Sequence, residues 1–227
     1  MKIFISDLHL GRGDELEDFL LWNAMAELSK TRARLEQPME LMHRAFAGFV
    51  RHILDQCAGR GRATPELVLL GDIFDLLQVL PERRNDPRKI SLIMKAHAPF
   101  FSALDSFLEG GGAVTLILGN HDYDLIHPRL HDALKRRIPR LNERHGGGPL
   151  LFYHDPESGI YAEHGNQFDA LNAWRNPGDP GEWPFGSELV LRLVNPLEKT
   201  FPILDNLGIR EALWFALRRL PEPAGPL

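Results

Sequence analysis

Short hydrophobic runs alternate along the chain with longer segments in which hydrophobic residues recur every three or four positions. The runs at 2–6, 67–70 and 114–118 are rich in Val, Ile, Leu and Phe, and each ends in polar residues, which predicts three buried strands. The periodic segments between them predict helices. Strands that alternate with helices form parallel sheets, because each helix returns the chain to the same end of the sheet. We therefore expect a layered α/β fold.

The helical segments have recognisable ends. Residues 14–57 carry two hydrophobic stripes, and Pro38 is expected to separate the two helices because proline interrupts a helix interior. The stripe at 100–108 should stop at the three glycines 110–112, and a further helix is expected at 128–140. These stripes are typical of helix faces that pack on a core.

Two sets of polar residues are expected at the surface. A helix after the second strand should present a solvated charged face with Arg83, Arg84, Arg88, Lys89 and Lys95. Histidines that do not follow a strand are also expected to be exposed: His43, His52, His127, His131, His145 and His154.

The second half of the chain changes character after Asp169. Runs at 150–153 and 159–162 predict a hairpin. The sequence after Asp169 is rich in proline, and its hydrophobic residues recur at helical spacing at 187–201 and 209–220. We therefore divide the chain into a core and a helical cap or insertion that ends in a proline-rich linker. Their boundaries are residues 1–175 and 176–227.

Composition narrows the functional classes. With 227 residues and 44% hydrophobic content, the chain can form one domain with an appendage, and no apolar stretch reaches the roughly 20 residues that span a membrane. The start turns polar too early for a signal peptide, and the single cysteine, Cys57, suits a reducing compartment, so we expect a cytoplasmic protein. A net charge of -5 argues against general nucleic-acid binding.

Residues that can bind metals follow each predicted strand. Asp7 and His9 come after the first strand, Asp72 after the second and the sequence Gly-Asn-His-Asp at 119–122 after the third, while His164 follows the hairpin. Alternation in an extended segment would point Asp7 and His9 to the same side. A carboxylate with an imidazole suits Mn²⁺, Fe or Zn²⁺ better than Ca²⁺.

Each block alone has an ordinary explanation. Gly, Asn and Asp are turn residues, so the tetrapeptide at 119–122 by itself would indicate a turn. Three such loops at the carboxyl ends of parallel strands meet at one edge of the sheet, however, and this favours a single site there.

The four blocks resemble the calcineurin-like metallophosphoesterase superfamily. Its pattern is Asp-x-His, Gly-Asp, Gly-Asn-His-Asp or Glu, a strand-end His, and Gly-His-x-His. The first four occur in this order across residues 3–169. The resemblance implies an α-β-β-α sandwich that is incomplete at the carboxyl end of this chain.

The resemblance also implies a pair of divalent metal ions. One ion would bind Asp7 and His9, Asp72 would bridge to the second, and Asn120 and His164 would bind the second. A shared carboxylate is chemically reasonable because it offsets the repulsion between two nearby cations. Mn is favoured among Mn, Fe, Zn, Mg, Ni and Co, since this ligand set accepts several metals.

The implied reaction is hydrolysis of a phosphomonoester, phosphodiester or pyrophosphate. A hydroxide bridging the metals would attack phosphorus, with His121 as general acid or transition-state stabiliser and Asp122 orienting its imidazole. The class of phosphoester substrate stays open between nucleotides, cyclic nucleotides, DNA ends, phosphoproteins and the nucleotide-linked acyl sugar of lipid A synthesis.

The fifth block is missing, because no histidine follows His164. The chain is then the first part of a longer protein, which we favour, a reduced homologue with a damaged metal site, or a chain whose site another chain completes. The alternative to an enzyme is a scaffold or binding protein that keeps the phosphoesterase fold.

The role of residues 176–227 has several interpretations. They would form a cap that lines a substrate pocket, a surface for self-association, a plain helical hairpin, or, at 209–220, a membrane-surface helix. The first two interpretations would use the aromatic residues Trp174, Trp183, Phe185, Trp214 and Phe215.

Overall fold

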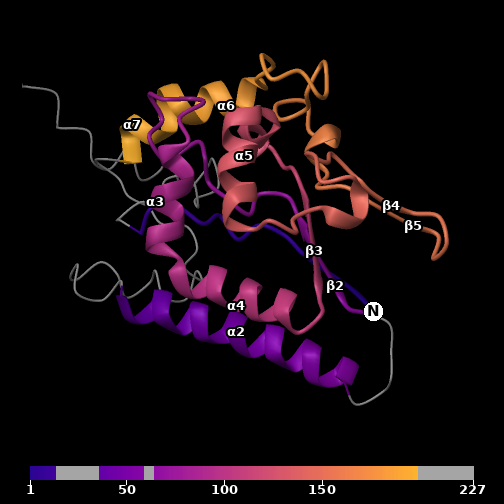
Figure 1. Ribbon diagram of the computed structural model, residues 1–227. Helices are drawn as coiled ribbons and strands as arrows, with labels where there is room; N and C mark the ends of the chain where they lie inside the picture. Colours follow the sequence, from indigo (N-terminus) through magenta and orange to yellow (C-terminus); the bar gives the residue numbers. More distant parts are fainter. Residues whose placement is uncertain (14–35, 59–63, 199–227) are drawn as a thin grey trace, which may run out of the picture.

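Three parallel strands form the centre of the fold in the order β1-β2-β3 (Figure 1). The computed structural model describes residues 1–13, 36–58 and 64–198. The strand bounds are Lys2–Ile5 for β1, Glu66–Leu70 for β2 and Ala113–Ile117 for β3. The three predicted strands and their parallel arrangement are confirmed.

Successive residues of each strand point to opposite faces of the sheet, and each face packs into a different hydrophobic core. Leu67 and Leu69 of β2 join the large core formed with the helices, whereas Val68 packs with Tyr153 on the opposite face. That second face is covered by the antiparallel hairpin of β4 (Tyr153–Asp155) and β5 (Ile160–Ala162). The predicted hairpin is confirmed. Strands β2 and β3 are buried on both faces, as is usual in parallel sheets, whereas the residues of β1 are half-buried.

Four helices in the described ranges build the large core on the other side of the sheet. These are α2 (Glu36–Ala58), α3 (Arg88–Ala96), α4 (Ala98–Glu109) and α5 (Pro128–Arg137). Helices α2 and α4 lie side by side, and the rings of Phe46 and Phe100 stack between them at 4.3 Å (Figure 1). Helix α4 ends at the predicted glycines. Pro38 lies in the first turn of α2, where proline is tolerated, and the first stripe of 14–57 lies outside the described residues.

Shorter helices complete the described chain. They are η3 (Tyr123–Ile126), η4 (Glu143–His145), η5 (Asn166–Phe168), α6 (Phe185–Leu189), η6 (Val190–Val194) and α7 (Asn195–Glu198). The predicted helix at 209–220 and the residues Trp214 and Phe215 lie outside the described residues. Among the helices in the described ranges, none has the length and apolar character needed to cross a membrane.

Two histidines predicted at the surface are buried. His43 is 5% exposed, and its ring nitrogen lies 3.0 Å from a ring nitrogen of His97; His131 is 8% exposed and faces a backbone carbonyl. The surface prediction was wrong for His43 and His131 because both lie on the inward faces of their helices. His52 and His154 are exposed, as predicted.

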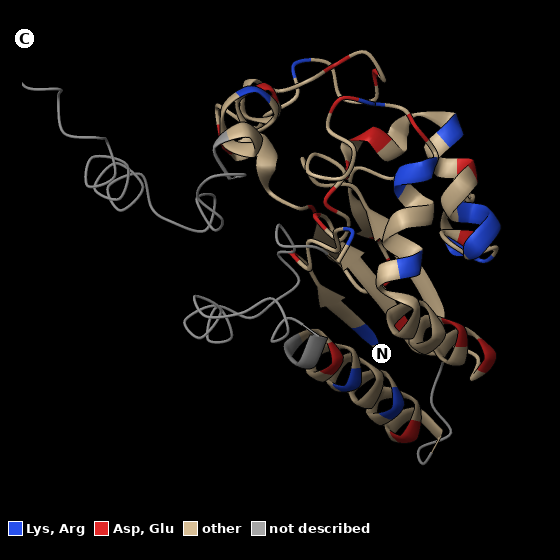
Figure 2. Ribbon diagram, turned by 90° about the vertical axis from the view of Figure 1, so that its left-hand side faces the viewer, with Lys and Arg blue, Asp and Glu red and all other residues tan. Residues whose placement is uncertain are grey.

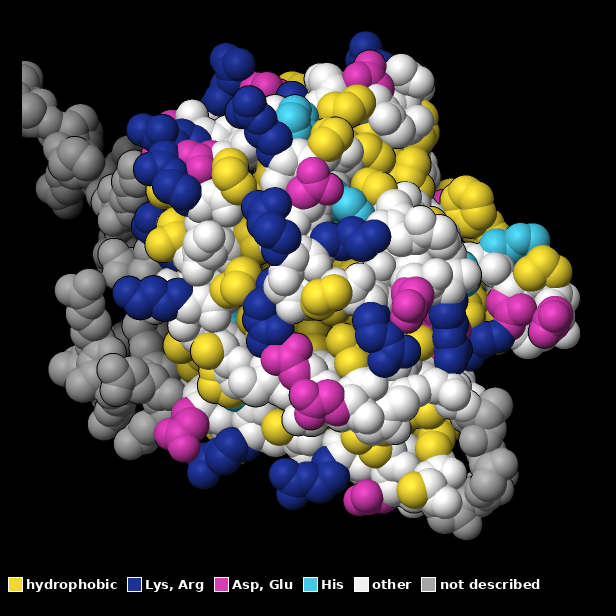
Figure 3. All heavy atoms as spheres, in the orientation of Figure 1, with side chains coloured by type: hydrophobic (Ala, Val, Ile, Leu, Met, Phe, Trp, Pro, Cys, Tyr) yellow, Lys and Arg dark blue, Asp and Glu magenta, His cyan; other side chains and the backbone are white. Residues whose placement is uncertain are grey.

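The charged face predicted after β2 is only partly solvated. Figure 3 shows Lys and Arg side chains spread over the face that carries α3 and α5. Lys89, however, is 1% exposed, and its Nζ donates a hydrogen bond of 2.6 Å to the carbonyl of Leu76. Arg83 and Arg84 precede α3 instead of belonging to it. The prediction was wrong for Lys89 because its long stem passes through the core to reach an acceptor.

Glu66 joins the sheet to the hairpin. It is 2% exposed and accepts hydrogen bonds from Thr115 Oγ1 at 2.7 Å and from the Tyr153 hydroxyl at 2.9 Å, while Arg144 and His145 lie beside it. Burial alone would raise the pKa of Glu66, but these hydrogen bonds lower it below its ordinary value. The folded protein therefore stabilises the charged carboxylate.

We expect Glu66→Gln to lower the free energy of unfolding by about 1–3 kcal/mol near neutral pH, because buried donors lose a charged acceptor. A carboxyl group with a lowered folded pKa stabilises the protein above its unfolded pKa, and this contribution disappears as pH falls through the folded pKa. Urea unfolding at about pH 7 and about pH 3.5 should therefore show a smaller difference at the lower pH. The exposed Glu143→Gln is the control; an equal loss at both pH values for Glu66→Gln would contradict the prediction.

Candidate metal centre

The loops that follow β1 and β2 run side by side past the strand ends. The backbone N–H of Asp7 donates to the carbonyl of Gly71 at 3.1 Å, and that of His9 to the carbonyl of Asp72 at 2.9 Å. Asp7, His9 and Asp72 all adopt left-handed backbone, with φ of 55°, 48° and 51°. Such positions cost about 1–3 kcal/mol each and persist where the surroundings enforce them. The hydrogen bonds between the loops supply that enforcement.

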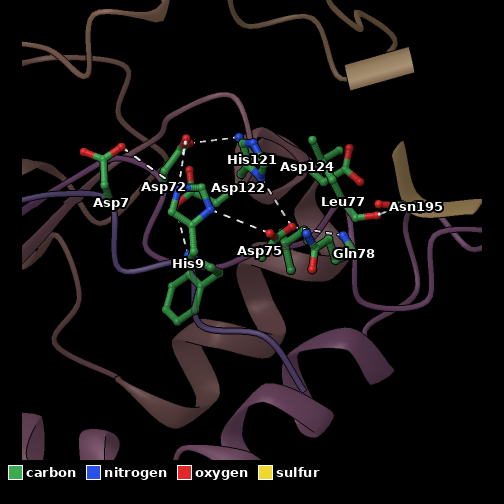
Figure 4. Close-up of polar contacts among 12 residues, drawn as sticks. Asp7, His9, Asp72, Asp75, Leu77, Gln78, His121, Asp122, Asp124 and Asn195 are labelled. Carbon is green, nitrogen blue, oxygen red and sulfur yellow. Dashed lines mark hydrogen bonds and ion pairs between the residues drawn. The ribbon is translucent and has the colours of Figure 1, made fainter. Parts of the chain in front are cut away.

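Two groups of potential metal ligands form at this edge of the sheet, and they share one carboxylate. The first contains His9, Asp72 and His121, and the second contains Asp7, Asp72 and His164; within each group the ligand atoms lie within 4.8 Å of one another. Figure 4 shows the side chains of the first group converging, and Figure 2 shows acidic residues in the loops at the strand ends. Four strand-end segments thus meet at one place, as predicted.

The imidazoles point toward Asp72. Nε2 of His9 lies 3.8 Å and Nε2 of His164 lies 3.2 Å from Asp72 Oδ2. The other ring nitrogen of His164, Nδ1, lies 3.1 Å from the carbonyl of Leu70. Metal-binding histidines commonly bond their second nitrogen to a carbonyl or carboxylate, which orients the ring. His164 is therefore oriented as a ligand would be.

The grouping differs from the expected assignment at two points. Asp7 falls with His164, although it also lies 4.0 Å from His9, and His121 falls with the ligands instead of standing apart from them. Asn120 lies half-buried in the same loop, and its role as a ligand stays a prediction.

Asp122 holds the loops together. Its fully buried carboxylate accepts hydrogen bonds from the backbone N–H of Gly119 at 2.7 Å and of Ile73 at 2.8 Å. Burial and then the charge of Asp72 raise the pKa of Asp122 to about 6, against the opposing effect of these donors. Asp122 thus joins the loops after β2 and β3, and the contact with the His121 ring that we expected of it is made by another residue.

That residue is Asp75. It is 1% exposed; its Oδ1 lies 3.3 Å from Nδ1 of His121 and its Oδ2 lies 3.6 Å from Nδ1 of His9. The Asp75 carboxylate thus lies next to the Nδ1 atoms of two candidate ligands, His9 and His121 (Figure 4). This role of Asp75 was not predicted, although the sequence carries one signal for it, a second acid three residues after Asp72.

Oppositely charged groups in this centre shift one another's pKa values. Burial alone would lower the pKa of His121, but the carboxylates of Asp75 and then Asp72 raise it to about 10. Burial also opposes a raised pKa at His164, where Asp72 raises it to about 9. The pKa of Asp72 is lowered, against the effect of burial, chiefly by His164. A bound cation would replace these protons, since metals and protons compete for the same nitrogens.

Two glycines provide space that the centre requires. A Cβ at Gly71, where φ is +84°, would lie 2.4 Å from the ring of His164. A Cβ at Gly119 would lie 2.2 Å from Asp72 Oδ1 and 2.6 Å from the backbone nitrogen of Asp72. These glycines therefore allow the ligand side chains to approach the ends of the strands.

The aromatic residues of the proposed cap have different surroundings. Trp174 is 5% exposed and stacks on Tyr123 at 4.4 Å, and Trp183 Nε1 donates to Asp124 at 3.0 Å. Phe185 is 65% exposed. Trp174 and Trp183 thus contact η3, the helix that follows His121, while a role in a substrate pocket or a subunit contact stays a prediction.

The residues present fit a pair of divalent cations. Mixed imidazole and carboxylate donors suit Mn²⁺, Fe and Zn²⁺. Asp75 lies 3.6 Å from Nδ1 of His9 and 3.3 Å from Nδ1 of His121, which leaves Nε2 of each ring for a cation. Comparisons of the chain with protein-family models, with curated proteins and with solved structures find no match.

Proposed function

We propose that the protein is a metal-dependent phosphoesterase with a dinuclear centre on Asp72. The proposal rests on one observation, that Asp72 belongs to both ligand groups while Asp7, His9, His121 and His164 surround it. Two cations a few ångströms apart repel each other, and a shared carboxylate offsets that repulsion. This arrangement suits transfer of a phosphoryl group to water.

The chain's own residues would hold the two cations, with Mn²⁺ as the favoured metal. His9, Asp72 and His121 would hold one, and Asp7, Asp72 and His164 the other. When bound, the metals would supply a water of lowered pKa and take up negative charge on the phosphoryl oxygens. Three protein donors per metal leave open positions for water and substrate.

His121 and Asp75 would manage the proton. Asp75 faces Nδ1 of His121 at 3.3 Å, so it orients the ring and favours a proton on that nitrogen. The raised pKa of His121, about 10, favours the imidazolium. His121 would therefore have one of two exclusive roles: bound through Nε2 it would be a ligand of the first cation, and unbound it would donate a proton from Nε2 to the leaving oxygen or stabilise charge on the phosphoryl group.

The arrangement of layers supports an α-β-β-α metallophosphoesterase sandwich. One face of the parallel sheet carries the helices, and the hairpin β4–β5 begins a second layer on the other face.

The test is hydrolysis of bis(p-nitrophenyl) phosphate by the full chain with MnCl2. We expect release of p-nitrophenol, and we expect His121→Ala to lower kcat by about 100-fold or more, the usual contribution of a general acid. His154→Ala, which removes an exposed histidine of the hairpin, is the matched control and should retain activity. Equal rates for the two variants, or no hydrolysis that depends on His121, would overturn the proposal.

A scaffold with this fold is the second candidate, and the absence of any histidine after His164 favours it. The Gly-His-x-His block would normally add one ligand to each metal. Metal analysis of the purified chain separates the two candidates. Close to two Mn per chain would support the enzyme, whereas occupancy far below one would support the scaffold.

A further inference from the structure

Asp124 is a buried carboxylate that the proposed reaction does not use. It lies in η3, three residues after His121, and is 4% exposed. Its Oδ1 accepts hydrogen bonds from Arg84 Nε at 3.1 Å and from Trp183 Nε1 at 3.0 Å, and its Oδ2 lies 3.9 Å from Lys89 Nζ. A buried charge is costly unless it is paired, so these partners fix its position.

Each partner of Asp124 comes from a different segment. Arg84 belongs to the loop that begins with Asp72, Trp183 belongs to the segment that leads to α6, and Lys89 belongs to α3. Lys89 Nζ also donates to the Leu76 carbonyl in the first of these loops. Asp124 therefore connects the loop that carries Asp72 and the loop that carries His121 with the start of the predicted cap.

Arg84 uses its planar guanidinium for several contacts at once. Its NH2 group donates to the carbonyls of Glu182 at 2.7 Å and of Pro180 at 3.2 Å, and the guanidinium lies 3.9 Å from the centre of the Trp183 ring. A lysine ammonium would keep the charge, but it cannot make this fork of hydrogen bonds and stack on the indole as well. The contacts thus depend on arginine itself.

The segment held by Arg84 also contacts η3 directly. The Tyr123 hydroxyl donates to the carbonyl of Asp179 and accepts from the N–H of Gly178, both at 3.1 Å. Residues 178–183 are therefore attached to η3 through Tyr123 and through Asp124. Any displacement of this segment would be transmitted to the loop that carries His121.

We propose that Asp124 and Arg84 are positioning residues of the metal centre. They set the loop that carries Asp72 and Asp75 relative to the loop that carries His121, and they hold residues 178–183 beside both. Metal ligands must be held to within about 0.5 Å, so loosening this junction moves His121 away from Asp72. The inference rests on the proposed function for the identity of the metal.

Arg137 offers a matched control for Arg84. It makes a bidentate pair with Asp105 at 2.7 and 2.6 Å, its guanidinium lies over the ring of Phe101, and its side chain is 25% exposed, against 27% for Arg84. The pair joins α5 to α4, and neither residue contacts a candidate ligand. Arg84→Lys and Arg137→Lys therefore disturb similar contacts at different distances from the centre.

The experiment titrates MnCl2 into the full-length protein by calorimetry. We expect Arg84→Lys to raise the Kd for Mn²⁺ by about 10-fold, the lower end of the range for groups that bond directly to metal ligands, because Arg84 acts through Asp124; Arg137→Lys should leave the Kd unchanged. Amide hydrogen exchange at residues 119–126 should become faster in Arg84→Lys alone. Equal effects of the two variants on the Kd and on hydrogen exchange would overturn the proposal, because the contacts of Arg84 would then contribute only to general packing.

Trp183→Phe covers the case in which Arg84→Lys fails to fold. It keeps an aromatic ring beneath Arg84, although a smaller one, and removes the Nε1–H donor to Asp124, so we expect the same changes with smaller size. Wild-type protein that binds no Mn²⁺ would count against the proposed function. Hydrogen exchange at 119–126 would still decide the positioning role, and unchanged exchange in these variants would count against it.

Discussion

Asp72→Ala is expected to abolish the binding of both cations and to lower phosphodiester hydrolysis by about 1000-fold or more. The carboxylate belongs to both ligand groups, and its Oδ1 also accepts a hydrogen bond of 2.9 Å from the backbone N–H of His121. Metal ions supply several kcal/mol of transition-state stabilisation, and about 4 kcal/mol corresponds to a thousandfold in rate. Elemental analysis of the dialysed protein and the rate with MnCl2 measure the two effects.

Asp7→Ala provides the informative comparison. Asp7 belongs to only one group, so its loss should remove one cation and leave the group of His9, Asp72 and His121 able to bind the other. Asp132→Ala, which changes an exposed acid on α5, should alter neither occupancy nor rate. Retention of one full cation by Asp72→Ala would contradict the shared-carboxylate arrangement.

Gly119→Ala is expected to disable the centre without removing any ligand. The new Cβ would lie 2.2 Å from Asp72 Oδ1, 2.6 Å from the Asp72 backbone nitrogen and 2.8 Å from the ring of His164. Relief requires movement of backbone, so we expect a loss of about 1–3 kcal/mol in the free energy of unfolding, as for overpacked cores. The Kd for Mn²⁺ should rise by more than about 100-fold, the upper range for disturbed support of ligands.

Thermal unfolding with and without MnCl2 measures both consequences of Gly119→Ala. Wild-type protein should be stabilised by the metal, because a ligand that binds only the folded state raises stability, whereas the variant should show little difference. Gly148→Ala is the control, since its Cβ would have no neighbour within 4 Å and its backbone is not left-handed. Normal metal-dependent stabilisation of Gly119→Ala would contradict the prediction, because it would show that the loop accommodates a Cβ at this position.

The parts of the fold that sequence reasoning predicted are those governed by local pattern. The strands at 67–70 and 114–118 are short, mostly apolar runs followed by glycine, and parallel pairing follows from the helices between them. Convergence of Asp72 and His121 then follows from topology alone, because strand ends of a parallel sheet share an edge. Hydrophobic residues at helical spacing likewise predicted which face of each helix packs into the core.

Single polar residues within those faces were harder to predict. His43 lies three residues before Phe46, on the inward face of α2, and the tertiary contact with His97 helps to make its burial tolerable. Lys89 is buried for a comparable reason, since its acceptor, the carbonyl of Leu76, lies in a loop whose course the sequence does not reveal. Burial of a polar group depends on a distant partner, and no local pattern encodes that partner.

Roles within the site were also hidden by backbone conformation. Alternation along an extended segment would send Asp7 and His9 to the same side, but both residues are left-handed, and Asp7 groups with His164. Likewise the chain order suggested that Asp122 would orient its neighbour His121, whereas Asp122 bonds to backbone and Asp75 faces the imidazole. Turn geometry, which decides such details, is set by contacts between loops.

The left-handed backbone at Asp7, His9 and Asp72 lowers the stability of the fold, while the side chains at the same positions are needed for metal binding. Glycine would occupy these positions without steric cost, so a screen for thermal tolerance alone would tend to discard the side chains that assemble the centre. Gains in heat resistance at these three positions should come with loss of bound metal. Engineering for robustness is therefore safer in the helices that cover the sheet than at the ends of its strands.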